Sequence, residues 1–161
     1  MNKVIKLYLA NSMENLPYDT VKYRNFYART MLSTMGIDVF DPIMKEKHTP
    51  GKIINLKNCG IKPETVMEMD FGAVQKAHIV FWITGDTASE GCVSEVTWAA
   101  CLNKFTNKLF PKKLIVVVSP TRHKSTPFKD RKIHFTTLHK DVAVVKTIDD
   151  GVEYIRKRFK L

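Results

Sequence analysis

Apolar residues along the chain gather either in short continuous runs or at helical spacing. Short runs, which are typical of buried strands, occupy 4–10, 37–42, 78–83, 113–120 and 142–147. Helical spacing covers 18–35, 63–77, 92–104 and 148–159. The run at 78–83 is the most continuous, which indicates a central strand that is covered on both faces.

This alternation of strands and helices predicts an α/β fold. We expect a Rossmann-like (flavodoxin-like), doubly wound parallel sheet of five strands with helices on both faces. No linker or internal repeat interrupts the sequence, so 1–161 is expected to form a single domain. A short edge element is expected over 132–137. The polar stretch 43–62 fits either a functional lid or a tolerated surface insertion.

The first predicted helix carries many aromatic and sulfur-containing side chains. Its helical spacing depends on Tyr23, Phe26, Tyr27, Thr30, Met31 and Met35. Gly36 follows the last of them and supplies the signal that ends the helix.

Composition places the chain among ordinary globular proteins. Hydrophobic residues make up 44% and charged residues 26% of the 161 positions. No apolar run reaches the roughly 20 residues of a membrane span, and the N-terminal run is too short for a secretory signal. We therefore expect a cytoplasmic protein. Three cysteines without C-x-x-C spacing and scattered histidines indicate neither a disulfide framework nor a metal site, and no cofactor is expected.

The chain carries a strong positive charge, with a formal net charge of +10. Such an excess suits nucleic acid, an acidic membrane surface or phosphorylated small substrates. Basic residues cluster at 45–52, at 121–132 and at the C-terminus. No basic strand interleaved with aromatic residues is present, which favours a solvated basic surface over a nucleic-acid groove.

Several nucleotide-binding and catalytic motifs are absent from the sequence. It contains no G-x-G-x-x-G, no G-x-x-x-x-G-K-[ST] and no G-x-S-x-G. Ligands of open α/β sheets bind beyond the carboxyl ends of the strands. With these motifs absent, the candidate catalytic residues around the central strand are acidic. Asp70 precedes the strand, and Asp86, Glu90 and Glu95 follow it.

Glu95 falls within the first two turns of the predicted helix that follows the central strand. A helix N-terminus favours an ionised carboxylate, and helical side chains tilt toward that end. Such a carboxylate could attack an electrophilic sugar carbon. The alternative is a glutamate selected only for its charge at a helix start.

Asp70 and Tyr8 are two further candidates. Asp70 lies among Met67, Met69 and Phe71, where a carboxyl group could act as a general acid; otherwise it is an exposed helix residue. Two carboxylates in one cleft are the minimum for retaining glycosyl chemistry. Tyr8 ends the first strand and could orient a carboxylate through its hydroxyl, or simply be a core residue.

Three segments resemble the nucleoside 2-deoxyribosyltransferase family, which includes the related 2'-deoxynucleoside 5'-phosphate N-hydrolases and hydroxymethyl-CMP hydrolases. They are KLYLANS, MDFGAVQKAHIVFWI and GDTASEGCVSEVTWAACLNK. The resemblance spans 4–119 and is weakest after residue 120. It is carried by the first strand, the Asp before an apolar strand, and the Glu within the helix after a Gly-containing turn.

The resemblance implies specific roles for individual residues. Glu95 would be the nucleophile that attacks C1' of the deoxyribose, Tyr8 would orient it, and Asp70 would contact the base or supply its proton. Ser89 and Ser119 would bind a 5'-phosphate, with Ser119 contributed by a neighbouring subunit. The implied substrate-binding residues are Asn11, Asp86, Ser89, Gly91 and Ser119.

The function expected from the resemblance is cleavage of the N-glycosidic bond of 2'-deoxynucleosides or their 5'-monophosphates. A covalent glycosyl–Glu intermediate would pass the sugar to another base, or to water in a hydrolase. A non-catalytic nucleotide- or nucleic-acid-binding module is the alternative from another class. The expected partners are a small nucleoside or nucleotide and further copies of the chain, with neither membrane nor nucleic acid expected.

Overall fold

A parallel sheet of five strands forms the centre of the protein. The computed structural model describes residues 4–13, 15–45, 48–55, 60–84, 89–105, 109–119 and 142–161. The strands lie in the order β2-β1-β3-β4-β5, and every neighbouring pair is parallel. This order is that of flavodoxin-like folds, so the predicted fold class is confirmed. The strands are β1 (Lys6–Asn11), β2 (Asp38–Phe40), β3 (Ile79–Ile83), β4 (Leu114–Val118) and β5 (Val142–Val145).

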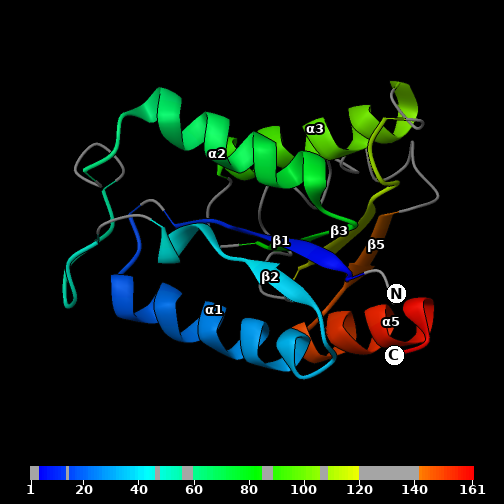
Figure 1. Cartoon of the computed structure of the whole chain (residues 1–161). Coiled ribbons are helices and arrows are strands. Elements are labelled where there is room, and N and C mark those ends of the chain that lie inside the picture. The colour runs from blue at the N-terminus through cyan, green and yellow to red at the C-terminus, as the bar shows by residue number, and fades with distance from the viewer. Residues whose placement is uncertain are drawn as a thin grey trace.

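Helices cover both faces of this sheet. In Figure 1, α1 and α5 lie on one face, and α2 and α3 lie on the other. Their bounds, with that of a short 3-10 helix, are α1 (Tyr18–Ser33), η1 (Pro42–Met44), α2 (Pro63–Lys76), α3 (Glu90–Phe105) and α5 (Ile148–Phe159).

Alternation along the strands builds two apolar cores. In β1, Leu7 and Leu9 pack toward α1 and α5, whereas Tyr8 and Ala10 pack toward α2 and α3. All five residues of β3 and of β4 are buried. This explains why those two strands read as continuous apolar runs in the sequence.

The end of α2 is held by a buried lysine. Lys113 is fully buried, and its Nζ donates hydrogen bonds to the carbonyls of Gln75 (2.9 Å), Ala77 (3.0 Å) and Pro111 (3.0 Å). Asn103 of α3 fixes the backbone of Lys113 by accepting from its N–H at 2.7 Å and donating to its carbonyl at 2.8 Å. An ammonium group thus satisfies carbonyls that a helix end leaves without intrahelical partners.

At the start of α5, backbone and side chains of Thr147 and Asp150 bond reciprocally. The Asp150 N–H donates to Thr147 Oγ1, and the Thr147 N–H donates to Asp150 Oδ2, each at 3.1 Å. This capping box satisfies two helix N–H groups. Next to it, Gly151 brings α5 close to the sheet, since a Cβ there would lie 2.6 Å from Phe81 Cε2.

The structure corrects the expected apolar face of α1. Its buried residues are Val21, Asn25, Ala28 and Leu32. By contrast, Tyr23 is 75% exposed and Phe26 is 56% exposed. The aromatic residues established the helix in the sequence but do not form its inner side.

The polar stretch after β2 is partly packed onto the body of the protein. Ile43 and Ile54 are buried with Val21 in a small apolar cluster. The Ile54 N–H donates to the Leu16 carbonyl at 2.8 Å. These residues anchor both ends of the described part of 43–55 to the start of α1. The edge element expected over 132–137 lies outside the described residues.

Candidate active site

Three of the sequence-predicted residues lie near one another between β1 and the layer of α2 and α3. Tyr8 points from β1 into the layer of α2 and α3, where Asp70 and Glu95 lie. Tyr8 is fully buried, Asp70 is 8% exposed, and Glu95 is half-buried in the second turn of α3. The alternative that Asp70 is an exposed helix residue is therefore wrong. Tyr8 is a buried core residue, as one of its two interpretations expected, and its hydroxyl lies near both carboxylates.

The pKa of the Tyr8 hydroxyl is affected by both carboxylates. Its pKa is raised well above the ordinary value, first by burial and then by the negative charges of Glu95 and Asp70, with a hydrogen-bonding contribution from Glu95. Tyr8 Oη has no partner of regular hydrogen-bond geometry in the part of the chain that the structure describes. The phenol and the Glu95 carboxylate are thus close neighbours that a small adjustment brings into a hydrogen bond. The phenol stays protonated and can only donate to that carboxylate.

The Tyr8 ring is held in place by stacking. Its centroid lies 5.7 Å from that of Phe40 at the end of β2, with an angle of 17° between the ring planes. The position of the hydroxyl is therefore set by the sheet itself and not by a loop.

A buried thiol adjoins Glu95. Burial, and then the charge of Glu95, raise the pKa of Cys92 to about 12, against the effect of the Ser89 and Ser12 hydroxyls and the Asn11 main chain. Cys92 is accordingly a neutral thiol and a poor nucleophile. Its surroundings place Ser12, which follows β1, and Ser89, which precedes α3, in the same neighbourhood as Glu95.

Ser89 caps α3. Its Oγ accepts a hydrogen bond of 3.4 Å from the Cys92 N–H. This use of the oxygen leaves the hydroxyl proton able to point toward a ligand. Gly91 is exposed, and a Cβ at that position would meet only Ser89 Oγ at 3.7 Å, which is an ordinary contact. Packing therefore does not require glycine at position 91.

Asn11 belongs to a buried polar network. Its side-chain amide donates to Asn25 Oδ1, and its side-chain carbonyl accepts from Arg24 Nη2. Arg24 Nη2 also donates to the Ser12 carbonyl at 3.0 Å, and Asn25 Nδ2 donates to Asp41 Oδ1 at 2.8 Å. The network ties the carboxyl ends of β1 and β2 to α1. The side chain that the resemblance assigns to substrate is thus engaged within the protein.

Asp41 is the acidic end of this network. It is 4% exposed. Burial raises the pKa of its carboxyl group, against the hydrogen bond from Asn25 and the charge of Arg29.

The remaining predicted residues lie apart from the Tyr8 cluster or outside the described residues. Ser119 follows β4 and is half-buried, with its N–H donating to the Val145 carbonyl at 2.8 Å. Nothing in the described structure joins it to Tyr8 or Glu95 within one chain. Asp86 lies outside the described residues.

Sequence reasoning missed Ser12, Cys92, Asn25 and Asp41. For Asn25 a signal existed, because it occupies the helical series Val21, Asn25, Ala28 and Leu32, where an uncharged polar side chain interrupts an apolar stripe. No sequence signal distinguishes Ser12 or Cys92 from ordinary loop and core residues.

Two cavities lie elsewhere in the molecule. One of about 390 Å³ follows the edge strand β2 and is lined by Lys6, Arg29, Asp38 and Asp41 among others. A second, of about 470 Å³, lies beside α1 and η1. None of Tyr8, Asp70 and Glu95 lines either one.

Two further features bear on function, namely metal sites and membrane-spanning helices. Within the described residues no three His, Cys, Asp or Glu side chains gather as a metal site would require. Among the helices that the structure describes, none combines the length and apolar character of a membrane-spanning segment.

Comparison with known proteins supports the fold. No protein-family model matches the sequence, and no curated protein matches it. Among solved structures, the CMP N-glycosidase BcmB of Clostridium botulinum is similar, with a TM-score of 0.59 and 14% sequence identity. The match covers 97% of this chain and 99% of that chain. The chain therefore shares the fold of that protein.

Proposed function

We propose that the protein cleaves the N-glycosidic bond of nucleosides or their 5'-monophosphates, with 2'-deoxynucleosides and their monophosphates as the first substrates to test. The observation that carries this proposal is the convergence of Asp70 and Glu95 on the buried phenol of Tyr8. Two carboxyl groups around one reacting carbon can serve as nucleophile and proton donor. The fold shared with a CMP N-glycosidase supports the same substrate class.

The reaction would proceed in two displacements. A carboxylate oxygen of Glu95 attacks C1' of the sugar while the bond from C1' to the base nitrogen breaks. The electron pair of that bond goes to the base, and the Asp70 carboxyl group supplies the proton that the leaving base needs. Tyr8 donates to Glu95 and holds it in line. In the second step an acceptor attacks C1', gives its proton to the Asp70 carboxylate, and releases Glu95 as a carboxylate.

The acceptor defines the enzyme class. A base as acceptor makes the protein a deoxyribosyltransferase, as the sequence resemblance suggests. Water as acceptor makes it an N-glycosidase, the activity named for BcmB. Ser89 at the start of α3 is the described residue best placed to donate to a 5'-phosphate, because helix N-termini favour anions. The assignment of 1–161 to one nucleoside 2-deoxyribosyltransferase-like domain and the homo-oligomer stay predictions.

Incubation with a panel of deoxynucleosides and their 5'-monophosphates tests the proposal directly. We expect release of free base, detected by chromatography, and an exchanged nucleoside when a foreign base is added to a transferase. Glu95→Gln should lower kcat at least about 1000-fold, because it removes the nucleophile while keeping the shape of the side chain. Mass spectrometry of wild-type protein quenched during turnover should find the sugar adduct on the Glu95 peptide.

The matched control is Glu153→Gln, a partly exposed glutamate of α5 that pairs with Arg156 at 3.3 Å. It should retain full activity. Full activity of Glu95→Gln would refute the mechanism. If no substrate in the panel reacts and the protein instead binds DNA with a steep dependence on salt, the non-catalytic alternative is correct.

A further inference from the structure

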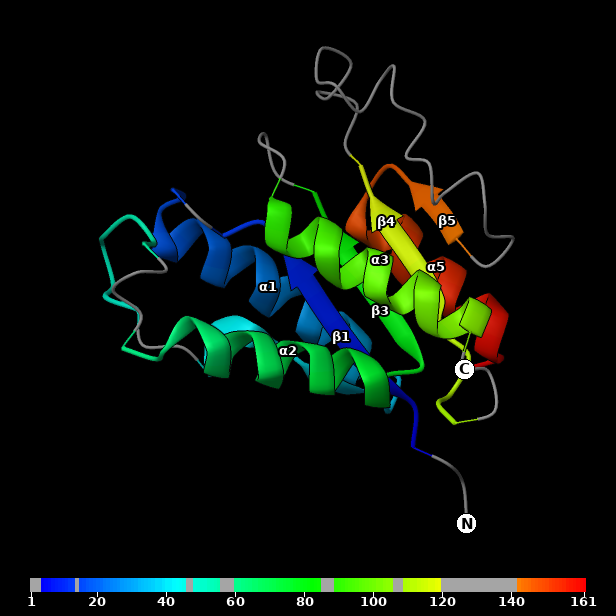
Figure 2. The ribbon, with the colours of Figure 1, turned by 90° about the horizontal axis from the view of Figure 1, so that it is seen from above.

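The two cavities outside the candidate active site adjoin each other beside the edge strand β2. Arg29, Asp41 and Met44 line both of them. Their volumes, about 390 Å³ and about 470 Å³, fall within the range of small-molecule sites. Because three side chains are shared, we treat the two cavities as one recess, the β2 recess. Seen from above, α2 lies toward the β2 edge of the sheet and α3 lies toward β4 and β5 (Figure 2).

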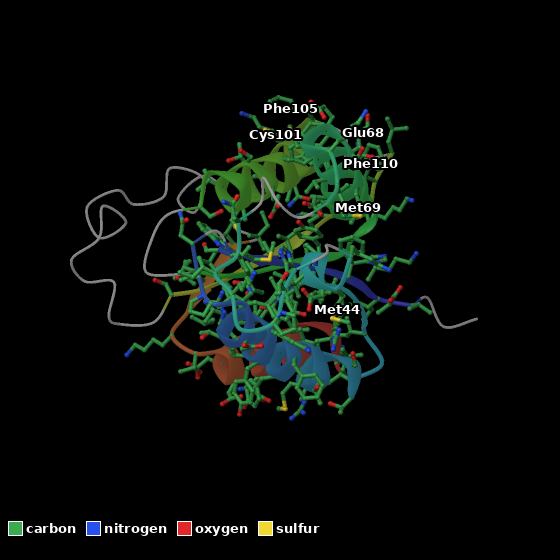
Figure 3. The ribbon with its side chains drawn as sticks, turned by 90° about the vertical axis from the view of Figure 1, so that its left-hand side faces the viewer. Met44, Glu68, Met69, Cys101, Phe105 and Phe110 are labelled. Atoms are coloured by element: carbon green, nitrogen blue, oxygen red, sulfur yellow. The ribbon has the colours of Figure 1, made fainter. Side chains whose placement is uncertain are left out.

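The larger cavity forms the aromatic half of the β2 recess. Tyr23 and Phe26 of α1 and Met44 of η1 line it, and all three side chains are exposed. Figure 3 shows Met44 between the ribbons of η1 and α1. The buried Ile43 lines the same cavity. The aromatic side chains on the outer side of α1, which the core does not use, therefore border a space that a flat apolar ring can occupy.

The smaller cavity forms the cationic half of the recess. Four cationic and two acidic side chains line it, namely Lys6, Arg29, Lys45, Lys76, Asp38 and Asp41. Asp38 lies beside Lys6 in the register of β1 and β2 and offsets part of its charge. Four positive and two negative charges leave an excess of two, which matches the charge of a phosphate monoester. In the aromatic half, Lys22 and Asp19 balance each other.

The cationic side chains of the recess have unused donors. Within the described residues, no ion pair engages any of its four cations. The Arg29 guanidinium lies 5.8 Å from the centroid of the Phe26 ring, where the two halves adjoin. Stacking of this kind holds a guanidinium in place and leaves its N–H groups available to an acceptor. The Asp41 carboxylate is bonded instead to Asn25 and to the Ile43 main chain.

We propose that the β2 recess is a second ligand site, which binds a small aromatic phosphate monoester. The ring lies in the aromatic half, and the phosphate accepts hydrogen bonds from Arg29 and the lysines of the cationic half. A joined ring and phosphate use both halves at once, whereas inorganic phosphate or an uncharged ring uses only one. Neither Asp70 nor Glu95 lines the recess, so the ligand is bound there and not cleaved. The proposal does not depend on the proposed reaction.

Isothermal titration calorimetry with 1-naphthyl phosphate tests this site. The probe joins a flat apolar ring to a phosphate and has no N-glycosidic bond, so the proposed reaction cannot consume it. It should bind the wild-type protein at least about tenfold more tightly than inorganic phosphate or 1-naphthol, because only the joined probe contacts both halves. Ser89→Ala, at the candidate active site, should leave this binding unchanged.

Two exposed residues, one in each half, provide the decisive variants. Phe26→Ala removes a ring face and Lys76→Glu reverses a charge, and each should raise the dissociation constant of the probe at least about tenfold. The matched controls are Tyr154→Ala on α5 and Lys146→Glu after β5, at exposed positions that line neither cavity. Both should bind the probe as the wild-type protein does. Circular dichroism of each variant confirms that it is folded.

The proposal is wrong if the probe does not bind at millimolar concentration or if inorganic phosphate binds as tightly. It is also wrong if either Phe26→Ala or Lys76→Glu binds the probe like wild-type protein. Binding that is lost in Ser89→Ala alone would assign the probe to the candidate active site and overturn the β2 recess. A protein that cleaves no nucleoside or nucleotide, yet binds the probe through Phe26 and Lys76, would confirm the recess while the proposed function fails.

Discussion

Burial of the Lys113 ammonium group is unfavourable, but the same group supplies hydrogen bonds that the fold requires. Burial lowers the pKa of its ammonium group to about 8 from 10.5. Yet Nζ is the donor for three carbonyls, those of Gln75 and Ala77 at the end of α2 and that of Pro111 just before β4. Removing the donor of a buried hydrogen bond lowers the free energy of unfolding by more than the bond itself contributes, because the acceptor is left without a partner.

We therefore expect Lys113→Met to lower the free energy of unfolding by about 1–3 kcal/mol at pH 7, because three carbonyls lose their donor. Urea denaturation measures the change. Between pH 8 and pH 10.5, the unfolded chain keeps a proton that the folded Lys113 has released, so this residue adds stability as pH rises through that range. The advantage of wild-type protein over Lys113→Met should accordingly be larger at pH 10 than at pH 7.

The control for this comparison is Lys146→Met, an exposed lysine between β5 and α5. Its effect on stability should be small, because the side chain is exposed. If the wild-type advantage over Lys113→Met shrinks as the pH rises, the carbonyl groups hold the proton on Lys113 and its pKa is not lowered.

Packing determines whether replacement of a helical glycine by alanine stabilises or destabilises this protein, as two positions show. In α5, a Cβ at Gly151 would lie 2.6 and 2.8 Å from ring atoms of the fully buried Phe81. In α2, a Cβ at Gly72 would meet nothing within 4 Å. Alanine favours a helix over glycine by about 1 kcal/mol in both places, so contact with the sheet makes the difference.

Gly151→Ala should destabilise the protein by about 1–2 kcal/mol, because overpacking against Phe81 exceeds the gain in helix propensity. Gly72→Ala should stabilise it by up to about 1 kcal/mol. Thermal or urea unfolding of both variants checks the opposite signs. Equal effects would mean that α5 can move away from the sheet without cost.

At the same scale, the sequence predicted the elements better than their orientations. Continuous apolar runs identified β3 and β4 because both of their faces are buried. The inner side of α1 was less apparent, because Asn25 is used there for hydrogen bonds while Tyr23 and Phe26 face outward. Glu95, Asp70 and Tyr8 could be named from the family resemblance. The contacts of Ser12 and Cys92 depend on which strand end and helix start meet in space, and spacing along the chain does not encode that.

At the scale of the whole molecule, the net charge of +10 affects how strongly charged ligands are attracted. A positive field raises the local concentration of a phosphorylated ligand and leaves a neutral one unaffected. Salt weakens this attraction, since the Debye length falls to about 3 Å at 1 M salt.

If the natural substrate carries a 5'-phosphate, kcat/KM for a monophosphate should fall about three- to tenfold between low and high salt. The corresponding nucleoside, as the neutral control, should react at a rate that salt hardly changes. Initial rates at several NaCl concentrations provide the measurement. Parallel behaviour of the two substrates would assign the excess charge to some other role.

The hydrogen-bonded set of Asn11, Asn25 and Asp41 limits how this protein can diverge. Asn25 is fully buried and hydrogen-bonds to Asn11 at the end of β1 and to Asp41 after β2. Replacement of any one of the three leaves buried polar atoms without a partner, so it is tolerated only with a matching change in another. Divergence in this part of the fold should therefore proceed by paired changes within the set, so that Asn11, Asn25 and Asp41 are kept or replaced together.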